Sequence, residues 1–455
     1  MKNQKNIVAI ISVTCISFLG IMTETSLNVA FPRLMNEFKV PLNIIQWLTT
    51  AYLLFIAILM MCSSYFSKAF SAREIFISSA TLFILGSIVS LLAPNFFILL
   101  IGRLLSSFGA GLCSPLMFNL IVELMPQDKW GFYLGLSGLV LSLAPALGPA
   151  YGGLMVEYFS WREIFLFTGI FALLIMLTGI NTVEKYYPKE KIKFAWLSFL
   201  SLSAILILLN LFLNQLSINL AVLLLISIFI FLIIYKKDRN RLFDFRIFKI
   251  RSFSLAFISY LLLQMMTIGI EFLLPNYMQL VNHLSPLNSA LILLPRSIIA
   301  SLLNPIFGRM YDDWNAKIPL YAGIVFILIS CILFSVFADG MTMALGTIFF
   351  IVFMLGRQMA FNNTLAEAMG YQKKEFRTDA TAVLQTGQQY AGSIGTILLS
   401  LIISLVQSNQ SNSHLAIAQG SRIDFMILGL ISACVIICYF FMFKLKNKKL
   451  LSTEL

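Results

Sequence analysis

The sequence predicts an all-α membrane protein that crosses the bilayer many times. Of its 455 residues, 59% are hydrophobic and only 11% are charged, whereas about a quarter of an ordinary soluble domain is charged. The mean hydropathy is +0.89, and apolar runs of about 20 residues, the length that crosses a bilayer core, recur along the whole chain. The composition therefore excludes a soluble enzyme and predicts a chain that is nearly all membrane.

Fourteen candidate spans follow when the apolar runs are cut at polar clusters. At about 20 residues per span, they leave connections too short for a soluble domain. An even number of spans puts both termini on one side of the membrane. The predicted spans start, in order, near Asn6, Ile44, Ile75, Phe96, Gly131, Trp161, Ala195, Asn219, Phe253, Pro286, Ile318, Met341, Thr378 and Ile423.

The distribution of Lys and Arg assigns the orientation, because cytoplasmic connections are enriched in these residues. With both termini in the cytoplasm, the inner segments carry 25 of the 32 basic residues and the outer connections carry four. The inverted topology would reverse this bias and is rejected. The net charge of +12 is thus a topology signal that needs no nucleic-acid partner. We expect a multi-pass protein of the cytoplasmic (plasma) membrane with both termini cytoplasmic.

The spans also repeat. Gly102-Arg103 in the fourth span and Gly356-Arg357 in the twelfth occupy equivalent points, 254 residues apart. Glu24 in the first span and Glu271 in the ninth each precede a proline near the outer helix end. Parallel repeats of this kind are typical of one large transporter fold. The predicted domains are an N-terminal six-helix bundle (1–182), an inserted pair of spans with cytoplasmic linkers (183–252) and a C-terminal six-helix bundle (253–455).

The most distinctive segment combines Gly and Pro in the fifth span, where the sequence reads APALGPAYGG over residues 144–153 and SWREIF over residues 160–165. Glycine lets a neighbouring backbone approach closely, and proline bends a membrane helix. The segment resembles the major facilitator superfamily, specifically its fourteen-helix drug/proton antiporter branch, whose fifth helix carries G-P-x-x-G-G ahead of W-R-x-I-F. The resemblance implies a hinge associated with exchange rather than uptake at Gly148, Pro149, Gly152 and Gly153.

The resemblance extends over essentially the whole chain, with two departures. The family places an Asp five residues before the Asn of N-V-A-x-P, but that position is Thr23 here and Glu24 follows it, about 100° further around the helix. The loop between the second and third spans, residues 64–72, lacks the Gly, Asp and second Gly of G-x-L-A-D-R-x-G-R. Gly308 and Asp312 keep the equivalent Gly and Asp in the second half, so we expect them to form the cytoplasmic gate with less help from the first half.

Glu24 and Glu271 are the only carboxylates that the prediction places within spans, where a charge costs at least a few kcal/mol. The protonation of such a group responds to desolvation and to nearby cations, so it can cycle as its surroundings change. We expect both to couple transport to protons, with Arg103, which lies at about the depth of Glu24, as an exchanging partner. In the family the matching arginine is implicated in proton transfer. The other interpretation is a structural ion pair with an intramembrane arginine.

Several further polar side chains lie within the predicted spans, where they are rare unless they face water or another helix. Arg296 and Arg357 could hold Glu271, bind an anionic substrate group or line a wet cavity, and the sequence does not rank these uses. Interhelical hydrogen bonding is as good an explanation as ligand contact for any single amide. The expected cavity wall comprises Asn28, Gln358, Asn362, Asn363, Gln385, Gln388 and Gln389 together with the two arginines.

The absence of certain motifs limits the chemistry. The chain has two His, no G-x-x-x-x-G-K-[ST] phosphate loop and no C-x-x-C pair, so we expect no metal, no cofactor and no enzymatic activity. We predict a monomeric proton-coupled antiporter that exports amphipathic cationic or zwitterionic drugs and dyes from the cytoplasm across the lipid bilayer by alternating access. The alternatives are a dedicated proton-coupled exporter of one metabolite, or an uncoupled channel or membrane sensor.

Overall fold

The structure, a computed structural model, describes most of the chain and contains no strand in the described residues. The chain divides into two compact units, residues 1–242 and residues 243–455, and each is described by itself. The described residues are 2–126, 130–184, 194–237, 244–295, 299, 303, 306–307, 310, 317–373, 376–408 and 413–451.

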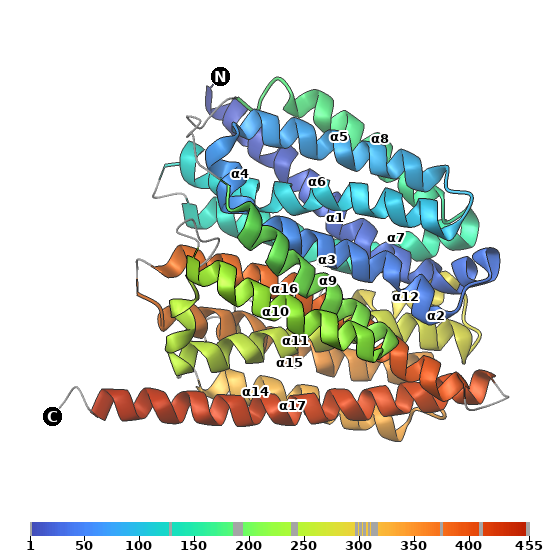
Figure 1. Cartoon of the computed structure of the whole chain (residues 1–455). Helices are drawn as coiled ribbons and strands as arrows, with labels where there is room; N and C mark the ends of the chain where they lie inside the picture. The colour runs from blue at the N-terminus through green and yellow to red at the C-terminus, as the bar shows by residue number, and fades with distance from the viewer. Residues whose placement is uncertain are drawn as a thin grey trace. The chain divides into compact units, whose positions relative to one another are not determined.

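The first unit is built from long helices joined by short connections (Figure 1). Lys5 near the start of α1 forms an ion pair of 2.7 Å with Glu184, which follows α8. The start of α1 and the end of α8 therefore lie at the same end of the unit. The helices are α1 (Lys2–Phe38), α2 (Leu42–Ile45), α3 (Trp47–Met61), α4 (Ser63–Ala69), α5 (Ala72–Leu91), α6 (Phe96–Leu124), α7 (Trp130–Tyr158), α8 (Glu163–Gly179), α9 (Trp196–Gln215) and α10 (Ile218–Lys237).

The second unit begins with a short 3-10 helix and continues with helices of similar length. In it, α11 packs against α15, α16 and α17, and α14 packs against α15 and α17. The elements are η2 (Phe245–Lys249), α11 (Arg251–Leu280), α12 (Pro286–Leu291), α14 (Lys317–Val336), α15 (Met343–Gly370), α16 (Arg377–Ser408) and α17 (Ser413–Leu451).

The helix starts agree with the predicted spans to within four residues, except at the last one. Helix α17 begins at Ser413, ten residues before the predicted Ile423, because the mixed polar sequence between them has too little hydropathy to be recognised as part of a span. Among the described residues, eleven helices are long and apolar enough to cross a membrane, and α8 is a shorter apolar helix. The count of fourteen spans stays a prediction, since most of the tenth lies outside the described residues.

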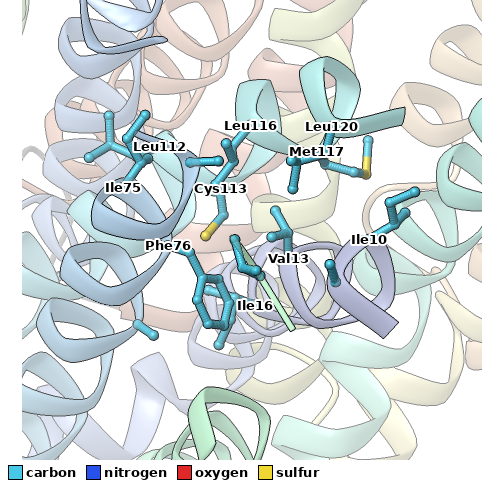
Figure 2. Close-up of a cluster of buried hydrophobic side chains, with 14 of the residues drawn as sticks. Ile10, Val13, Ile16, Ile75, Phe76, Leu112, Cys113, Leu116, Met117 and Leu120 are labelled. Carbon is cyan, nitrogen blue, oxygen red and sulfur yellow. The ribbon is translucent and has the colours of Figure 1, made fainter. Parts of the chain in front are cut away.

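The core of the first unit lies between α1, α5 and α6. Ile10, Val13 and Ile16 of α1 face Phe76 of α5 and Cys113 of α6, and all five are at most 4% exposed (Figure 2). Ile10, Val13 and Ile16 follow one another at three-residue spacing and so share one face of α1. The packing therefore holds α1, which carries Glu24, against α6, which carries Arg103.

Close glycine crossings accompany the repeated Gly-Arg pairs. A Cβ added to Gly86 of α5 would lie 2.6 Å from the carbonyl oxygen of Gly102 of α6, and one added to Gly323 of α14 would lie 2.6 Å from that of Gly356 of α15. Glycine at these crossings lets two helix backbones touch. The predicted repeat is thus visible in each unit as the same crossing, with the arginine next to the contact.

Helices α9 and α10, the inserted pair, pack against each other. Their most apolar 18-residue windows are only 17% and 0% buried, respectively, although their sequences are rich in Leu, Ile and Phe. Apolar helices with so little covered surface are suited to lipid contact. Their separation from the N-terminal bundle as a domain stays a prediction.

Candidate functional site

The first unit buries a glutamate, an arginine and a tyrosine from three different helices. Glu24 of α1 is 5% exposed, and Arg103 of α6 and Tyr52 of α3 are both fully buried. The Arg103 guanidinium lies over the Tyr52 ring, 3.9 Å from its centroid, and interacts electrostatically with Glu24. The structure therefore places Glu24 near enough to act on the charge of Arg103, while their exchange as coupling partners stays a prediction. It adds Tyr52, which sequence reasoning missed because nothing in a lone span-embedded tyrosine indicates its partner.

Arg103 retains hydrogen-bonding capacity. Its Nε donates to the carbonyl oxygen of Leu48 over 3.4 Å, while Nη1 and Nη2 are buried and donate to no partner among the residues that the structure describes. The Tyr52 hydroxyl donates to the carbonyl oxygen of Gly20 over 2.9 Å, which fixes the ring beneath the guanidinium. Unsatisfied buried donors are costly, so Arg103 is suited to take up an anionic group when the surroundings change.

Asn28 lies one turn beyond Glu24 on the same face of α1. It is 3% exposed, and its Oδ1 accepts a hydrogen bond of 2.6 Å from the Thr49 hydroxyl of α3. Pro32, four residues further on inside the helix, cannot donate to the Asn28 carbonyl. In this conformation Asn28 thus joins two helices, which is the interhelical alternative left open by the sequence; its place in a cavity wall stays a prediction.

The predicted hinge glycines of α7 contact the segment of α1 that bears Glu24. A Cβ at Gly152 would overlap the carbonyl oxygen of Ser26, and one at Gly148 would overlap the Thr25 hydroxyl and lie 2.7 Å from the carbonyl oxygen of Met22. Pro149 and Gly153 are buried beside them. Any change in the packing of α7 against α1 therefore moves the backbone on both sides of Glu24.

The second unit contains the corresponding acid and arginine. Glu271 of α11 is 5% exposed, and Arg357 of α15 donates from Nε to the Thr267 hydroxyl over 3.3 Å and from Nη1 to Gln358 Oε1 over 3.1 Å. Thr267 lies one turn before Glu271 on the same helix face. Arg357 thus reaches the face of α11 that bears Glu271, and the four-residue spacing from Glu271 was the signal that could have identified Thr267.

An aromatic and amide group extends this arrangement to α16. The Arg357 guanidinium lies 4.3 Å from the Phe361 ring centroid, and Phe361 stacks on Tyr260 at 4.4 Å. The Tyr260 hydroxyl donates to Gln388 Oε1 over 2.7 Å. Four residues, from Arg357 to Gln388, are therefore linked within one unit. The other predicted wall residues are Gln358 and Asn363, which are buried, Gln385 and Gln389, which are half-buried, and Asn362, which is exposed.

Helix α16 contacts α11 through glycine, as α7 contacts α1. A Cβ at Gly395 would lie 2.5 Å from the carbonyl oxygen of Met265, two residues from Thr267. In each unit the acid-bearing helix is thus packed directly on a glycine-bearing helix. Glycine at such contacts leaves no side chain to hold the helices apart.

Three predicted site residues, Arg296, Gly308 and Asp312, lie outside the described residues. The cytoplasmic gate therefore stays a prediction. Within the described part of the chain, no group of three or more His, Cys, Asp or Glu lies close enough to hold a metal ion.

The altered loop of the first half forms helix α4. Its Ser67 hydroxyl accepts a hydrogen bond of 2.9 Å from Asn119 of α6, and the Tyr65 ring lies 4.5 Å from that of Phe194. Phe194 in turn packs on Trp196, the first residue of α9. Aromatic packing therefore occupies the place of the charged family motif and attaches the start of α9 to this loop.

The SWREIF segment joins three connections at the other end of the unit. Trp161 Nε1 donates to Glu37 over 2.7 Å, Arg162 forms an ion pair of 2.9 Å with Glu37, and Arg162 also donates to the carbonyl oxygen of Ala93 over 3.1 Å. These bonds tie the end of α1 to the start of α8 and to the connection after α5. The segment thus fixes one end of the helix that carries Glu24.

Asp424 is a further buried carboxylate, and the prediction that only Glu24 and Glu271 lie within spans is wrong. It is fully buried in α17, and neither of its oxygens has a hydrogen-bond partner among the described residues. Ser421, one turn earlier, is equally buried with an unpartnered hydroxyl. The late start assigned to the fourteenth span placed Asp424 at its edge, which is why the sequence did not reveal it.

Replacing Asp424 with Leu is expected to stabilise the protein by about 1–3 kcal/mol, because it removes a buried polar group without a partner and leaves an apolar one of similar size. Thermal unfolding of the purified protein measures the change. Asp339→Leu is the matched control, since Asp339 is an exposed acid paired with Arg422 in the same unit, and we expect a change below about 1 kcal/mol there. A lower melting temperature for Asp424→Leu would show that the carboxylate is held by a partner.

Each unit of this multi-helix membrane protein has a buried glutamate and an arginine on neighbouring helices. This construction is typical of a carrier rather than of an enzyme. The chain belongs to the Major Facilitator Superfamily, whose sequence profile matches residues 13–396. This family carries out membrane transport, so the chain is a transporter and a multi-pass plasma-membrane protein.

Similar proteins agree with this assignment. The chain is 30% identical over 421 residues to the lincomycin resistance protein LmrB of Bacillus subtilis (strain 168), covering 88% of this chain and 85% of the relative. It is 25% identical over 422 residues to the riboflavin transporter RibZ of Clostridioides difficile (strain 630), covering 90% and 91%. A bacterial homologue of the human lysosomal transporter Spinster, in an inward-facing and unoccupied conformation, has the same fold, with a TM-score of 0.73, 13% identity and coverage of 96% and 97%.

Proposed function

We propose that the protein is a proton-coupled antiporter that exports amphipathic drugs and dyes by alternating access. The observation that carries the proposal is the buried group of Glu24, Arg103 and Tyr52. A carboxylate at membrane depth near a cation can exist in two states: protonated, or ionised and in contact with the cation. Proton coupling requires a group that alternates between such states. Export is supported by the resemblance to a resistance protein.

In this proposal the residues that couple transport to protons also lie at the helix contacts that change during transport. Protonation of Glu24 weakens its attraction to Arg103, and the unpartnered Nη1 and Nη2 of Arg103 then favour a different arrangement of α6. Because α7 touches α1 at Met22 and Ser26, the rearrangement around Glu24 is passed to α7. Glu271 and Arg357 act in the same way in the second unit.

The proposed substrates are cationic or zwitterionic amphipathic compounds. Two buried acids in apolar surroundings can compensate a positive charge, and 41 Phe and 20 Met supply adaptable apolar surface of the kind that promiscuous binders use. The second candidate is a proton-coupled exporter dedicated to one metabolite, and it is favoured by the resemblance to a riboflavin transporter.

Efflux from proteoliposomes with an imposed pH gradient tests the proposal. Cationic, zwitterionic and anionic dyes are loaded in parallel, and the pH inside is measured with a trapped indicator. We expect several cationic or zwitterionic compounds to be moved against their gradients, with an equivalent proton flux in the opposite direction. Collapse of the gradient with a protonophore is expected to stop accumulation.

The other functions predict different results. A dedicated exporter moves one compound of the panel and ignores the rest, and an uncoupled channel lets compounds equilibrate whether or not the gradient is present. Accumulation that persists after the protonophore would contradict proton coupling. Empty liposomes are the control for passive leakage.

A further inference from the structure

A cavity at one end of the second unit is not used by the transport mechanism. It has a volume of 530 Å³ and lies between the first turns of α11 and the last part of α17, two helices that pack side by side (Figure 1). It is lined by Arg251, Ser254, Leu255, Phe441, Lys444 and Leu445.

The wall of this cavity is almost wholly apolar, and its charged lining residues are both cations. Arg251 and Lys444 are both exposed, and neither forms an ion pair with a described residue. The six lining residues include no acid. A third cation, Lys317 at the start of α14, lies over the Phe443 ring at 5.7 Å at the same end of the unit. The cavity therefore favours a ligand whose apolar part fills it and whose anionic group lies beside these cations.

The positions of the lining residues place charge above apolar surface. Leu255 lies one helical turn beyond Arg251 in α11, and Phe441 lies one turn before Lys444 in α17, so on both helices the apolar side chain is about 5 Å deeper in the membrane than the cation. The Ser254 hydroxyl donates to the carbonyl oxygen of Phe248 over 3.0 Å. The two cations thus remain as the donors available to a ligand.

The location in the membrane follows from the predicted topology. The start of α11 and the end of α17 face the cytoplasm under the positive-inside assignment, which puts Arg251 and Lys444 at the headgroup level of the inner leaflet. Phe441 lines the cavity and is still 48% exposed. A ligand with an anionic head and a hydrocarbon tail matches this order of charge and apolar surface.

We propose that this cavity binds an anionic phospholipid of the inner leaflet, with the phosphate between Arg251 and Lys444 and an acyl chain along Leu255 and Phe441. Basic residues near an anionic membrane surface contribute about 1 kcal/mol each. Two of them predict a preference of about 30-fold for phosphatidylglycerol over phosphatidylcholine, since about 1.4 kcal/mol is a factor of ten. The bound lipid would hold the start of α11 against the end of α17.

Native mass spectrometry of the full-length protein, titrated with phosphatidylglycerol or phosphatidylcholine, tests the proposal. The wild type is expected to bind phosphatidylglycerol about 30-fold more tightly, and the R251Q/K444Q variant is expected to bind the two lipids equally. K236Q/K373Q is the matched control, because it removes two exposed basic residues elsewhere on the predicted inner side and should keep the preference. R251K/K444R retains both charges and should keep it as well.

Two results would overturn the proposal. One is an unchanged preference in R251Q/K444Q, provided that its melting temperature shows that it is folded; if it is unfolded, an unchanged preference in both R251Q and K444Q supplies the same test. The other is displacement of bound phosphatidylglycerol by an equal concentration of inorganic phosphate, which would make this a site for free phosphate. Neither result depends on which compound the protein transports.

Discussion

Glu24→Gln is expected to remove the contribution of one proton to substrate accumulation while leaving substrate exchange intact. A gradient of one pH unit is worth about 1.4 kcal/mol per proton, which supports a substrate concentration ratio of about ten for each coupled proton. Gln has nearly the shape of Glu but binds no proton, so the ratio should fall about tenfold. The measurement is steady-state dye accumulation in proteoliposomes without a membrane potential.

Counterflow of labelled against unlabelled substrate separates a coupling defect from a folding defect. A variant that still exchanges substrate is folded and able to change conformation, and we expect Glu24→Gln to retain exchange. Glu123→Gln is the matched control, because Glu123 is an exposed glutamate on α6, the helix that carries Arg103, and its accumulation ratio should equal that of the wild type. An unchanged ratio in Glu24→Gln would remove Glu24 from the coupling mechanism.

The position of the helices could be predicted from the sequence because bilayer thickness fixes the length of an apolar run. This constraint acts locally, so starts such as Phe96 and Pro286 coincide with the helices of the structure. It fails where polar residues belong to a long helix. The segment from Ser413 to Ile423 lies inside α17 although its composition resembles a loop, and Asp424 was therefore overlooked.

The partners of the site residues could be predicted only in part, because contacts between helices depend on rotation and crossing angle. The shared depth of Glu24 and Arg103 was readable from their places in two spans, and the structure places them near enough to interact. Tyr52 was not readable, because its role comes from the crossing of α3 with α6. Arg357 was assigned three possible uses, and the structure shows its contact with Thr267, which depends on the packing of α15 against α11.

The glycine motif illustrates a pattern whose physical meaning needed the structure. The family resemblance associated Gly148 and Gly152 with antiport, and the structure shows that both contact α1. Both face the turn of α1 between Met22 and Ser26, which contains Glu24. The hinge segment and the predicted proton site are therefore in direct contact through the backbone of α1.

Gly152→Ala is consequently expected to have the largest effect of any single methyl group in the first unit. The new Cβ would overlap the backbone carbonyl of Ser26, and a backbone obstacle cannot rotate away as a side chain can. Helices α1 and α7 must then separate, at a cost of about 1–3 kcal/mol for overpacking, although Ala is otherwise the better helix former by about 1 kcal/mol. Transport is expected to fall at least tenfold, measured as the initial rate of dye efflux.

Two further variants identify the cause of that loss. Gly370→Ala adds the same methyl group at the end of α15, where nothing lies within 4 Å of the new Cβ, so its melting temperature and transport rate should equal or exceed those of the wild type. Ser26→Ala combined with Gly152→Ala shortens the facing side chain but leaves the carbonyl in place, so the double variant should remain as defective as Gly152→Ala alone. Recovery of transport in the double variant would place the obstacle in the Ser26 hydroxyl and contradict the backbone contact between the hinge and the helix of Glu24.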